Sequence, residues 1–94
     1  MSDLRIQIAQ LVDAGRGERV WVPADFAHLA TRDAVDKTLQ RLVAAGELRR
    51  IDRGLYDKPV VNQLTRRPNP PNYRAVVEAI ARRDRLRLLV DGMT

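Results

Sequence analysis

The sequence contains no cysteine, and its only histidine is His28. Without cysteine, the chain forms no disulfide, no zinc–thiolate site and no thiol nucleophile. One isolated imidazole does not supply the nucleophile, base and orienting group that nucleophilic catalysis requires. The sequence also lacks a glycine-rich phosphate loop and any His/Asp spacing typical of metal ligands. We therefore expect that the protein is not an enzyme and that it holds no cofactor or metal ion.

Long apolar runs are lacking too, because charged residues interrupt each run well before the roughly 18 residues that a bilayer span needs. The first residues, Met1-Ser2-Asp3-Leu4-Arg5, do not resemble an export signal. We expect no membrane partner and a cytoplasmic location. A length of 94 residues leaves room for a single hydrophobic core.

Lysine is scarce, since only Lys37 and Lys58 occur among 17 basic residues, and the other basic residues are arginines. The net charge of +5 is concentrated in residues 49–74, where seven basic residues face two acidic ones, while the charges of the remaining chain nearly cancel. A basic cluster of this kind favours a polyanionic partner such as nucleic acid. Arginine richness by itself is also explained by the base composition of a genome, so the cluster needs support from the fold.

Apolar periodicity and turn residues predict a succession of short elements. In chain order they are a helix over residues 3–14, a β-type run over 20–22, a short helix over 23–30, a helix over 31–45, a hairpin of 48–51 and 55–56, a helix over 72–83 and a strand over 85–90. This order predicts an α+β fold, a winged helix-turn-helix with an extra C-terminal helix and strand. We divide the chain into a winged helix-turn-helix DNA-binding domain (1–58), a Pro-rich extended connector (59–71) and a C-terminal helix and strand (72–94) that pack on the domain or form a dimer contact.

Two apolar stripes and four further residues define the expected core. Leu4, Ile8, Leu11 and Val12 recur at helical spacing in the first helix, and Val35, Leu39, Leu42 and Val43 do so in the helix over 31–45. Thr31 is a suitable N-cap for the helix over 31–45, and Gly46 is a suitable residue to end it. Trp21, Phe26, Leu55 and Tyr56 are expected to complete the core.

The residues expected to contact DNA lie on two neighbouring elements. A helix reads the major groove when its outward face carries long polar side chains, and a wing hairpin needs basic residues that meet phosphate or the minor groove. The candidates are Arg32, Lys37, Gln40 and Arg41 on the helix and Arg49, Arg50 and Arg53 on the hairpin. The simpler alternative is that these residues form an ordinary solvated surface, with Asp33 as the helical salt-bridge partner of Lys37.

Two motifs carry a resemblance to a known family. Residues 20–26 read VWVPADF and residues 53–59 read RGLYDKP. The run from Ala34 to Pro59 resembles the N-terminal winged-helix domain of AbiEi-type antitoxins. The whole resemblance covers residues 18–59 well and residues 72–94 more loosely. The resemblance implies a DNA-binding autorepressor of a toxin–antitoxin operon, with a nucleotidyltransferase-like toxin as a second partner. It does not extend to the larger domain by which full-length antitoxins of this type neutralise the toxin, so DNA binding is the better supported role.

Other functions and assemblies stay open. A winged helix that binds an acidic protein surface and never meets DNA is the main alternative, and RNA binding is weaker because aromatic residues make up only 4% of the chain. Arg66 and Arg67 in the connector form either a phosphate-reaching arm or part of a plain linker. The segment from Asn72 to Val90 holds more apolar residues than its own packing needs, which predicts a homodimer, at least on DNA. These residues are Val76, Val77, Ile80, Leu86, Leu88 and Leu89.

Overall fold

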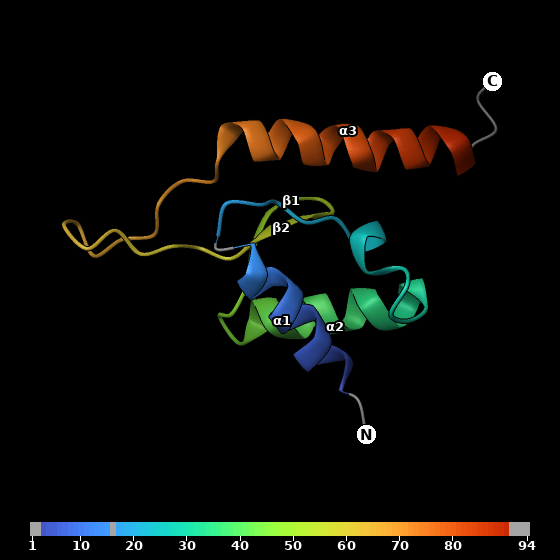
Figure 1. Ribbon diagram of the computed structural model, residues 1–94, viewed down its shortest axis with the longest axis horizontal. Coiled ribbons are helices and arrows are strands. Elements are labelled where there is room, and N and C mark those ends of the chain that lie inside the picture. Colours follow the sequence, from blue (N-terminus) through green and yellow to red (C-terminus); the bar gives the residue numbers. More distant parts are fainter. Residues whose placement is uncertain (1–2, 16, 91–94) are drawn as a thin grey trace.

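Helices, a tight turn and a hairpin follow one another in the predicted order as far as residue 57. The computed structural model describes the backbone of residues 3–15 and 17–90 and the side chains of 3–15 and 17–85. The elements are α1 (Leu4–Ala14), the 3-10 helix η1 (Pro23–Phe26), α2 (Arg32–Ala44), β1 (Arg49–Asp52), β2 (Leu55–Asp57) and α3 (Tyr73–Val90). Figure 1 shows the hairpin in the middle of the molecule, with α3 on one side and α1 and α2 on the other. This is a small α+β domain, consistent with a winged-helix-like arrangement.

The sheet is the antiparallel hairpin of β1 and β2, extended by one residue of the segment that precedes η1. Arg49 pairs with Asp57 and Arg50 with Tyr56, and the register shifts before Asp52. Trp21 forms an isolated antiparallel bridge to Tyr56, with N–O distances of 2.6 and 2.9 Å between their backbones. The β-type run predicted at residues 20–22 therefore meets the hairpin at this single bridge and adds no strand to the two-stranded sheet.

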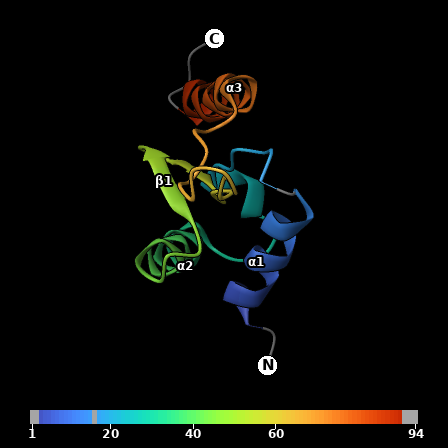
Figure 2. The same cartoon turned by 90° about the vertical axis from the view of Figure 1, so that its left-hand side faces the viewer.

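A first core cluster lies between α1, η1, α2 and the hairpin. In Figure 2, α1 and α2 lie at one end of the molecule and α3 at the other. Its buried residues are Ile8, Val12, Phe26, Val35, Leu39, Leu42, Leu48 and Tyr56, and Trp21 packs against them. Both predicted stripes are confirmed except at Leu11, which is 36% exposed. Ile8 and Val12 already fill the contact with α2, so Leu11 at the edge of the stripe faces solvent.

A second core cluster attaches α3 to the other face of the hairpin. Val20, Val22 and Leu55 are buried there against Ala79 of α3, and Val76 and Ile80 pack around them. The small side chain of Ala79, fully buried, allows the helix to approach the strand closely. The C-terminal helix thus packs on the domain with the face that contains Val76 and Ile80.

The boundaries of α2 agree with its predicted caps. The Thr31 hydroxyl accepts a hydrogen bond from the backbone N–H of Ala34 at 3.3 Å, which satisfies one of the free donors at the helix start. The helix ends at Ala44, and Gly46 adopts a φ of 78°, which a glycine allows without strain.

The short helix predicted over 23–30 is wrong in extent, because η1 has only four residues. Backbone N–H groups of Asp25, Ala27 and Leu29 donate to carbonyls three residues earlier, the pattern of a 3-10 helix. Phe26 and Leu29, the core contacts of this segment, are spaced by three residues, which suits three residues per turn better than a full α-helix.

The C-terminal strand predicted over 85–90 is wrong, since α3 continues through Val90. The alternation of arginine and leucine there resembles a strand, but no helix-breaking residue separates it from the preceding helix, and arginine and leucine are good helix formers. The Asp91-Gly92 pair, whose glycine predicts a turn after this segment, lies outside the described residues.

The Pro-rich segment predicted as an extended connector instead folds back on itself. Residues 58–72 leave the hairpin, project from the body and return to the start of α3 (Figure 1). Val61 and Pro68 form an antiparallel bridge within this excursion. In the part of the chain that the structure describes, no helix is long and apolar enough to cross a membrane.

Candidate nucleic-acid interface

The outward face of α2 carries most of the predicted helix residues. Val35, Thr38, Leu39 and Leu42 are buried, which fixes the rotation of the helix about its axis. Arg32, Lys37, Gln40 and Arg41 are all exposed. The last three stand at i, i+3 and i+4, so they share one face of the helix.

The charged residues of α2 differ in how far they are already paired. Lys37 Nζ lies 3.3 Å from Asp33, as predicted, and Arg32 Nε donates to Asp36 at 3.0 Å, both as exposed i,i+4 pairs. Such pairs stabilise a helix by only about 0.3–0.5 kcal/mol, so a phosphate can replace the carboxylate at small cost. Gln40 and Arg41 make no side-chain hydrogen bond or ion pair among the described residues, and are free to meet a partner.

Arg49 of the hairpin is held by its own domain. Its Nε and Nη2 donate to the two carboxylate oxygens of Asp57 at 2.9 and 2.7 Å, and its Nη1 donates to the carbonyl of Asn69 at 2.9 Å. The Asp57 side chain is only 3% exposed. The hydrogen bonds to this carboxylate, together with its charge, raise the pKa of Arg49 above its ordinary value. Each nitrogen of this guanidinium is thus already used, which places Arg49 apart from the other hairpin arginines.

Arg50 and Arg53 are exposed, the first on β1 and the second in the turn before β2. Arg50 stands next to Arg49 on the strand, so the two side chains point to opposite faces of the hairpin. The turn itself depends on Gly54, whose φ of 71° is costly for residues with a side chain. Among the hairpin candidates, these two arginines are therefore free to contact phosphate.

Two arginines of α3, which the sequence analysis did not identify, hold the hairpin turn and the segment before η1 by hydrogen bonds. Arg83 Nη1 donates to the carbonyl of Arg53 at 2.8 Å, and Arg82 Nη2 donates to the carbonyl of Val20 at 2.7 Å and to Asp25 at 3.2 Å. The wing turn and the start of η1 are thus both tied to α3. The only signal in the sequence is the arginine pair itself, which does not reveal its partners.

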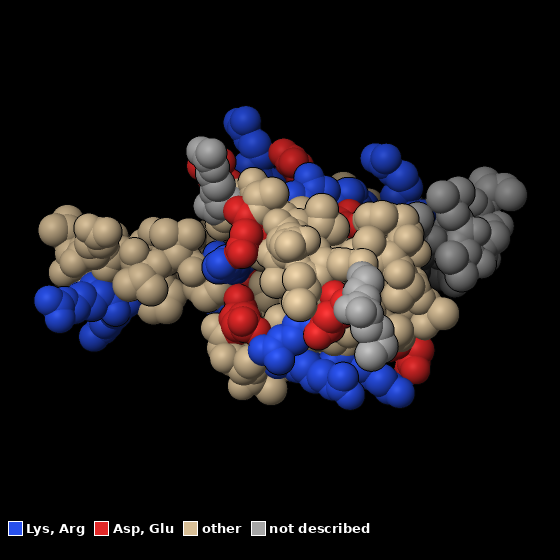
Figure 3. All heavy atoms as spheres, turned by 60° about the horizontal axis from the view of Figure 1, so that its bottom comes forward, with Lys and Arg blue, Asp and Glu red and all other residues tan. Residues whose placement is uncertain are grey.

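The face of the molecule drawn in Figure 3 carries both basic and acidic residues. Figure 3 shows Lys and Arg atoms in a row along one edge of the body, with acidic atoms scattered beside them. A second group of basic atoms lies on the projecting segment of residues 58–72. This pattern fits a partner that is contacted along an edge and at one outlying point.

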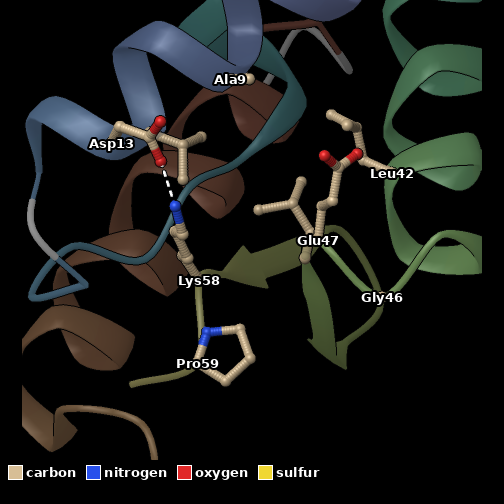
Figure 4. Close-up of a pocket in the computed structure, with 9 residues that line it drawn as sticks. Ala9, Asp13, Leu42, Gly46, Glu47, Lys58 and Pro59 are labelled. Atoms are coloured by element: carbon tan, nitrogen blue, oxygen red, sulfur yellow. Dashed lines mark hydrogen bonds and ion pairs between the residues drawn. The ribbon is translucent and has the colours of Figure 1, made fainter. Parts of the chain in front are cut away.

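A pocket of about 310 Å³ lies elsewhere, where the end of α1 meets the turn after α2 and the end of β2 (Figure 4). Lys58 forms an ion pair with Asp13 across it, and Glu47 on its rim pairs with Arg5 at 2.6 Å. Its charges are therefore already compensated. The described residues contain no group of His, Cys, Asp or Glu side chains that could hold a metal ion. The pocket offers no arrangement of catalytic groups.

Comparison with known proteins gives one match. No curated protein and no solved structure shows significant similarity to the chain. The profile of a family described as "Family of unknown function (DUF6088)" matches residues 7–94, which include α2, the hairpin and α3. Because this match covers nearly the whole sequence, the chain belongs to the DUF6088 family.

Proposed function

We propose that the protein is a sequence-specific DNA-binding transcriptional regulator. The observation that carries the proposal is the shared exposed face of Lys37, Gln40 and Arg41 on α2, the helix that follows η1 and leads into the hairpin. In this role α2 enters the major groove, which is about 12 Å wide and admits an α-helix. The hairpin then lies over the neighbouring backbone of the duplex.

The free side chains on α2 have the chemistry that base reading requires. A glutamine pairs bidentately with adenine and an arginine with guanine, and each good pair contributes about 1–3 kcal/mol of discrimination. Gln40 and Arg41 are the residues of this face without partners in the described structure, so they are assigned to bases. Lys37 and Arg32, each beside an aspartate, are assigned to phosphate.

The hairpin arginines are assigned to backbone contacts that carry no sequence information. Arg50 and Arg53 are exposed and unpaired among the described residues, and phosphate contacts of this kind set the register of a protein on DNA. Arg49, which sequence reasoning placed with them, supports the shape of the hairpin through Asp57 and has less freedom to reach DNA.

The biological role that fits best is an antitoxin-like autorepressor of a toxin–antitoxin operon. This part of the proposal is supported by the resemblance of residues 20–26 and 53–59 to AbiEi-type antitoxins, and it implies a nucleotidyltransferase-like toxin as a further partner. A repressor gains affinity by pairing two modules on an inverted repeat. The exposed residues Tyr73 and Val77 of α3 are the surface assigned to a homodimer, since Val76 and Ile80 are used in the second core cluster. Leu86, Leu88 and Leu89 have side chains outside the described residues.

The test is binding of the full chain to a fluorescently labelled duplex from its own promoter region, measured by anisotropy over a series of salt concentrations. Four to six phosphate contacts give a slope of log K against log salt of roughly −4 to −5. Gln40→Ala should weaken the best site by about 1–3 kcal/mol and random DNA little, whereas Arg53→Ala should weaken all duplexes alike. Gln10→Ala, an exposed glutamine of α1, is the matched control. Absence of binding at low salt, or a slope near zero, refutes the proposal.

A protein-interaction role is the second candidate. It is favoured by the pairing of Arg32 and Lys37 with aspartates on the same helix, which lowers the positive potential that α2 presents. If the chain binds no duplex but Gln40→Ala and Arg41→Ala weaken its binding to a co-purified protein, this second function replaces the first.

A further inference from the structure

The segment that projects from the body is an ordered hairpin, which we call the arm and define as residues 60–69. Its two sides are joined by hydrogen bonds from Asn69 N to Val60 O at 2.8 Å and from Asn62 N to Arg67 O at 2.9 Å. Val61 and Pro68 face each other between these bonds. The arm is therefore a short antiparallel ladder that extends away from the domain core, as Figure 1 shows.

The tip of the arm is fixed by its own side chains. Asn62 Oδ1 accepts hydrogen bonds from the backbone N–H groups of Leu64 and Thr65 at 2.8 and 3.1 Å, and Asn62 O accepts one from Arg66 N at 2.7 Å. Arg66 adopts a φ of 59°, a left-handed conformation that the turn requires. The Thr65 hydroxyl accepts from Arg67 N at 3.3 Å. Hydrogen bonds within the tip thus tie the backbone N–H groups of residues 64–67.

The base of the arm is anchored to the wing hairpin. Arg49 is bound to the buried carboxylate of Asp57 by its Nε and Nη2, and its Nη1 donates a hydrogen bond to the carbonyl of Asn69. The direction in which the arm projects is therefore set by β1 and β2, the hairpin that also carries Arg50 and Arg53.

The arm presents two cations and three apolar side chains, of which Val60 and Val61 near its base are 46% and 58% exposed. Leu64 at its tip is 95% exposed, the largest value among the exposed large hydrophobic residues of the described chain. Arg66 and Arg67 are exposed and form no ion pair among the described residues. From residue 58 to residue 77 the sequence contains no acidic residue at all. An ordered hairpin with an exposed leucine beside two unpaired arginines is suited to a partner that has negative charge outside and apolar surface inside, as a DNA duplex has in its phosphates and stacked bases.

We propose that the arm enters the DNA minor groove beside the groove that α2 reads, with Arg66 and Arg67 on the phosphates and Leu64 inserted between base pairs. The minor groove of B-DNA is about 6 Å wide, and β-ribbons enter it in proteins that widen the groove and kink the duplex. Apolar wedges such as leucine unstack a base step there and kink the duplex. In Figure 3 the basic atoms of the arm and the basic row along the body both lie toward the lower edge of the view. The proposal requires that one duplex contacts both groups. This inference rests on the proposed DNA binding and adds a second groove and a bend to it.

The wedge is tested by the bend that it produces. Wild-type protein is added to a duplex of about 30 base pairs with a fluorescence donor and acceptor at its ends. We expect energy transfer to rise as the ends approach, by a kink of roughly 20–90°. Leu64→Ala should abolish most of this rise in energy transfer. It should weaken binding by no more than about tenfold, because the lost apolar contact is offset by the free energy of unstacking the base pairs, which the variant no longer spends. Leu64 is almost fully exposed, so this substitution leaves the fold intact; Ile6→Ala, an exposed apolar residue of α1, is the control.

The cations are tested by salt dependence. The double variant Arg66→Ala/Arg67→Ala should make the slope of log K against log salt shallower by about two units, since each phosphate contact contributes about 0.9. The matched variant Arg74→Ala/Arg85→Ala removes two exposed arginines from α3 and should leave the slope within the error of the wild type. Netropsin, which occupies the minor groove, should compete with the wild type more strongly than with the double variant, in which Leu64 is the part of the proposed contact that is left.

The outcomes separate this inference from the function on which it rests. If Gln40→Ala weakens binding while both arm variants bend and bind DNA as the wild type does, the arm does not touch DNA and the inference is refuted with the proposed function intact. If the arm variants leave DNA binding unchanged but convert a dimer to a monomer, the arm is a protein contact and the inference is equally refuted. If the wild type binds no duplex, both proposals fail together.

Discussion

Removal of the Arg49 guanidinium should destabilise the fold, in contrast to removal of its neighbour Arg50. In Arg49→Ala, the carboxylate of Asp57 stays buried but loses both of its hydrogen-bond donors. Breaking a buried ion pair by removing one partner costs about 3–5 kcal/mol. The Arg49 side chain is 28% exposed, so water reaches part of the space that it leaves, and we expect a loss of about 2–4 kcal/mol in the free energy of unfolding.

This loss is large for a chain of 94 residues, whose whole stability is about 5–14 kcal/mol. It corresponds to a fall in melting temperature of roughly 10–25 °C. The assay is urea unfolding followed by the fluorescence of Trp21, the single tryptophan, which stacks on Phe26 with ring centroids 5.3 Å apart. Unfolding removes this contact, so the emission reports the state of the first core cluster.

Arg50→Ala is the matched control, because Arg50 is exposed and lies one residue away on the same strand. It should change stability by less than about 0.5 kcal/mol while weakening DNA binding. A double-mutant cycle with Asp57→Ala should give a coupling energy of about 1–3 kcal/mol between the two residues. Equal and small losses of stability for Arg49→Ala and Arg50→Ala, with no coupling to Asp57, would show that the pair does not support the hairpin.

Three further changes test other parts of the molecule. Ala79→Leu should lower the free energy of unfolding by about 1–3 kcal/mol in urea melts, because it overpacks the contact between α3 and β2, whereas exposed Ala81→Leu on the same helix should have little effect. The pKa of Arg49 is raised in the folded state, so its contribution to stability is fully present below the unfolded-state pKa and is lost only as the pH rises through the folded-state pKa. The difference in melting temperature between wild type and Arg49→Ala should therefore be the same at about pH 7 and pH 10; a decrease over this range contradicts the assignment. Val77→Glu, at a site that is 47% exposed, should convert a dimer to a monomer in light scattering and reduce a two-half-site footprint to one; unchanged mass excludes this face of α3 as the dimer contact.

The elements that the sequence predicts correctly depend on local signals. The start of α2 follows from the hydroxyl of Thr31, its end from Gly46, and its rotation from apolar residues at helical spacing. Each of these acts within about one turn of chain, so no knowledge of the tertiary fold is needed. The exposed face with Gln40 and Arg41 follows from the same periodicity.

The features that the sequence does not reveal depend on contacts between distant segments. Residues 85–90 alternate as a strand does, but a strand needs a partner edge, and only the folded chain shows that this segment extends α3 instead. Arg49 looks like any other hairpin arginine until the register places Asp57 opposite it. The arm escapes prediction because the side chains of Asn62 and Thr65 stabilise its turn, whereas four prolines in the surrounding segment indicate an open linker.

The two core clusters differ in when they can form during synthesis. Every buried residue of the first cluster lies between Ile8 and Tyr56, so it can assemble once that much chain has left the ribosome. The second cluster requires Ala79, and Arg82 reaches back across 62 residues to the carbonyl of Val20. At about 5–20 residues per second, the chain between the hairpin and the end of α3 takes a few seconds to appear. During this interval the nascent domain exposes Val20, Val22 and Leu55, and a chaperone that protects it must recognise this strand face and release it to α3.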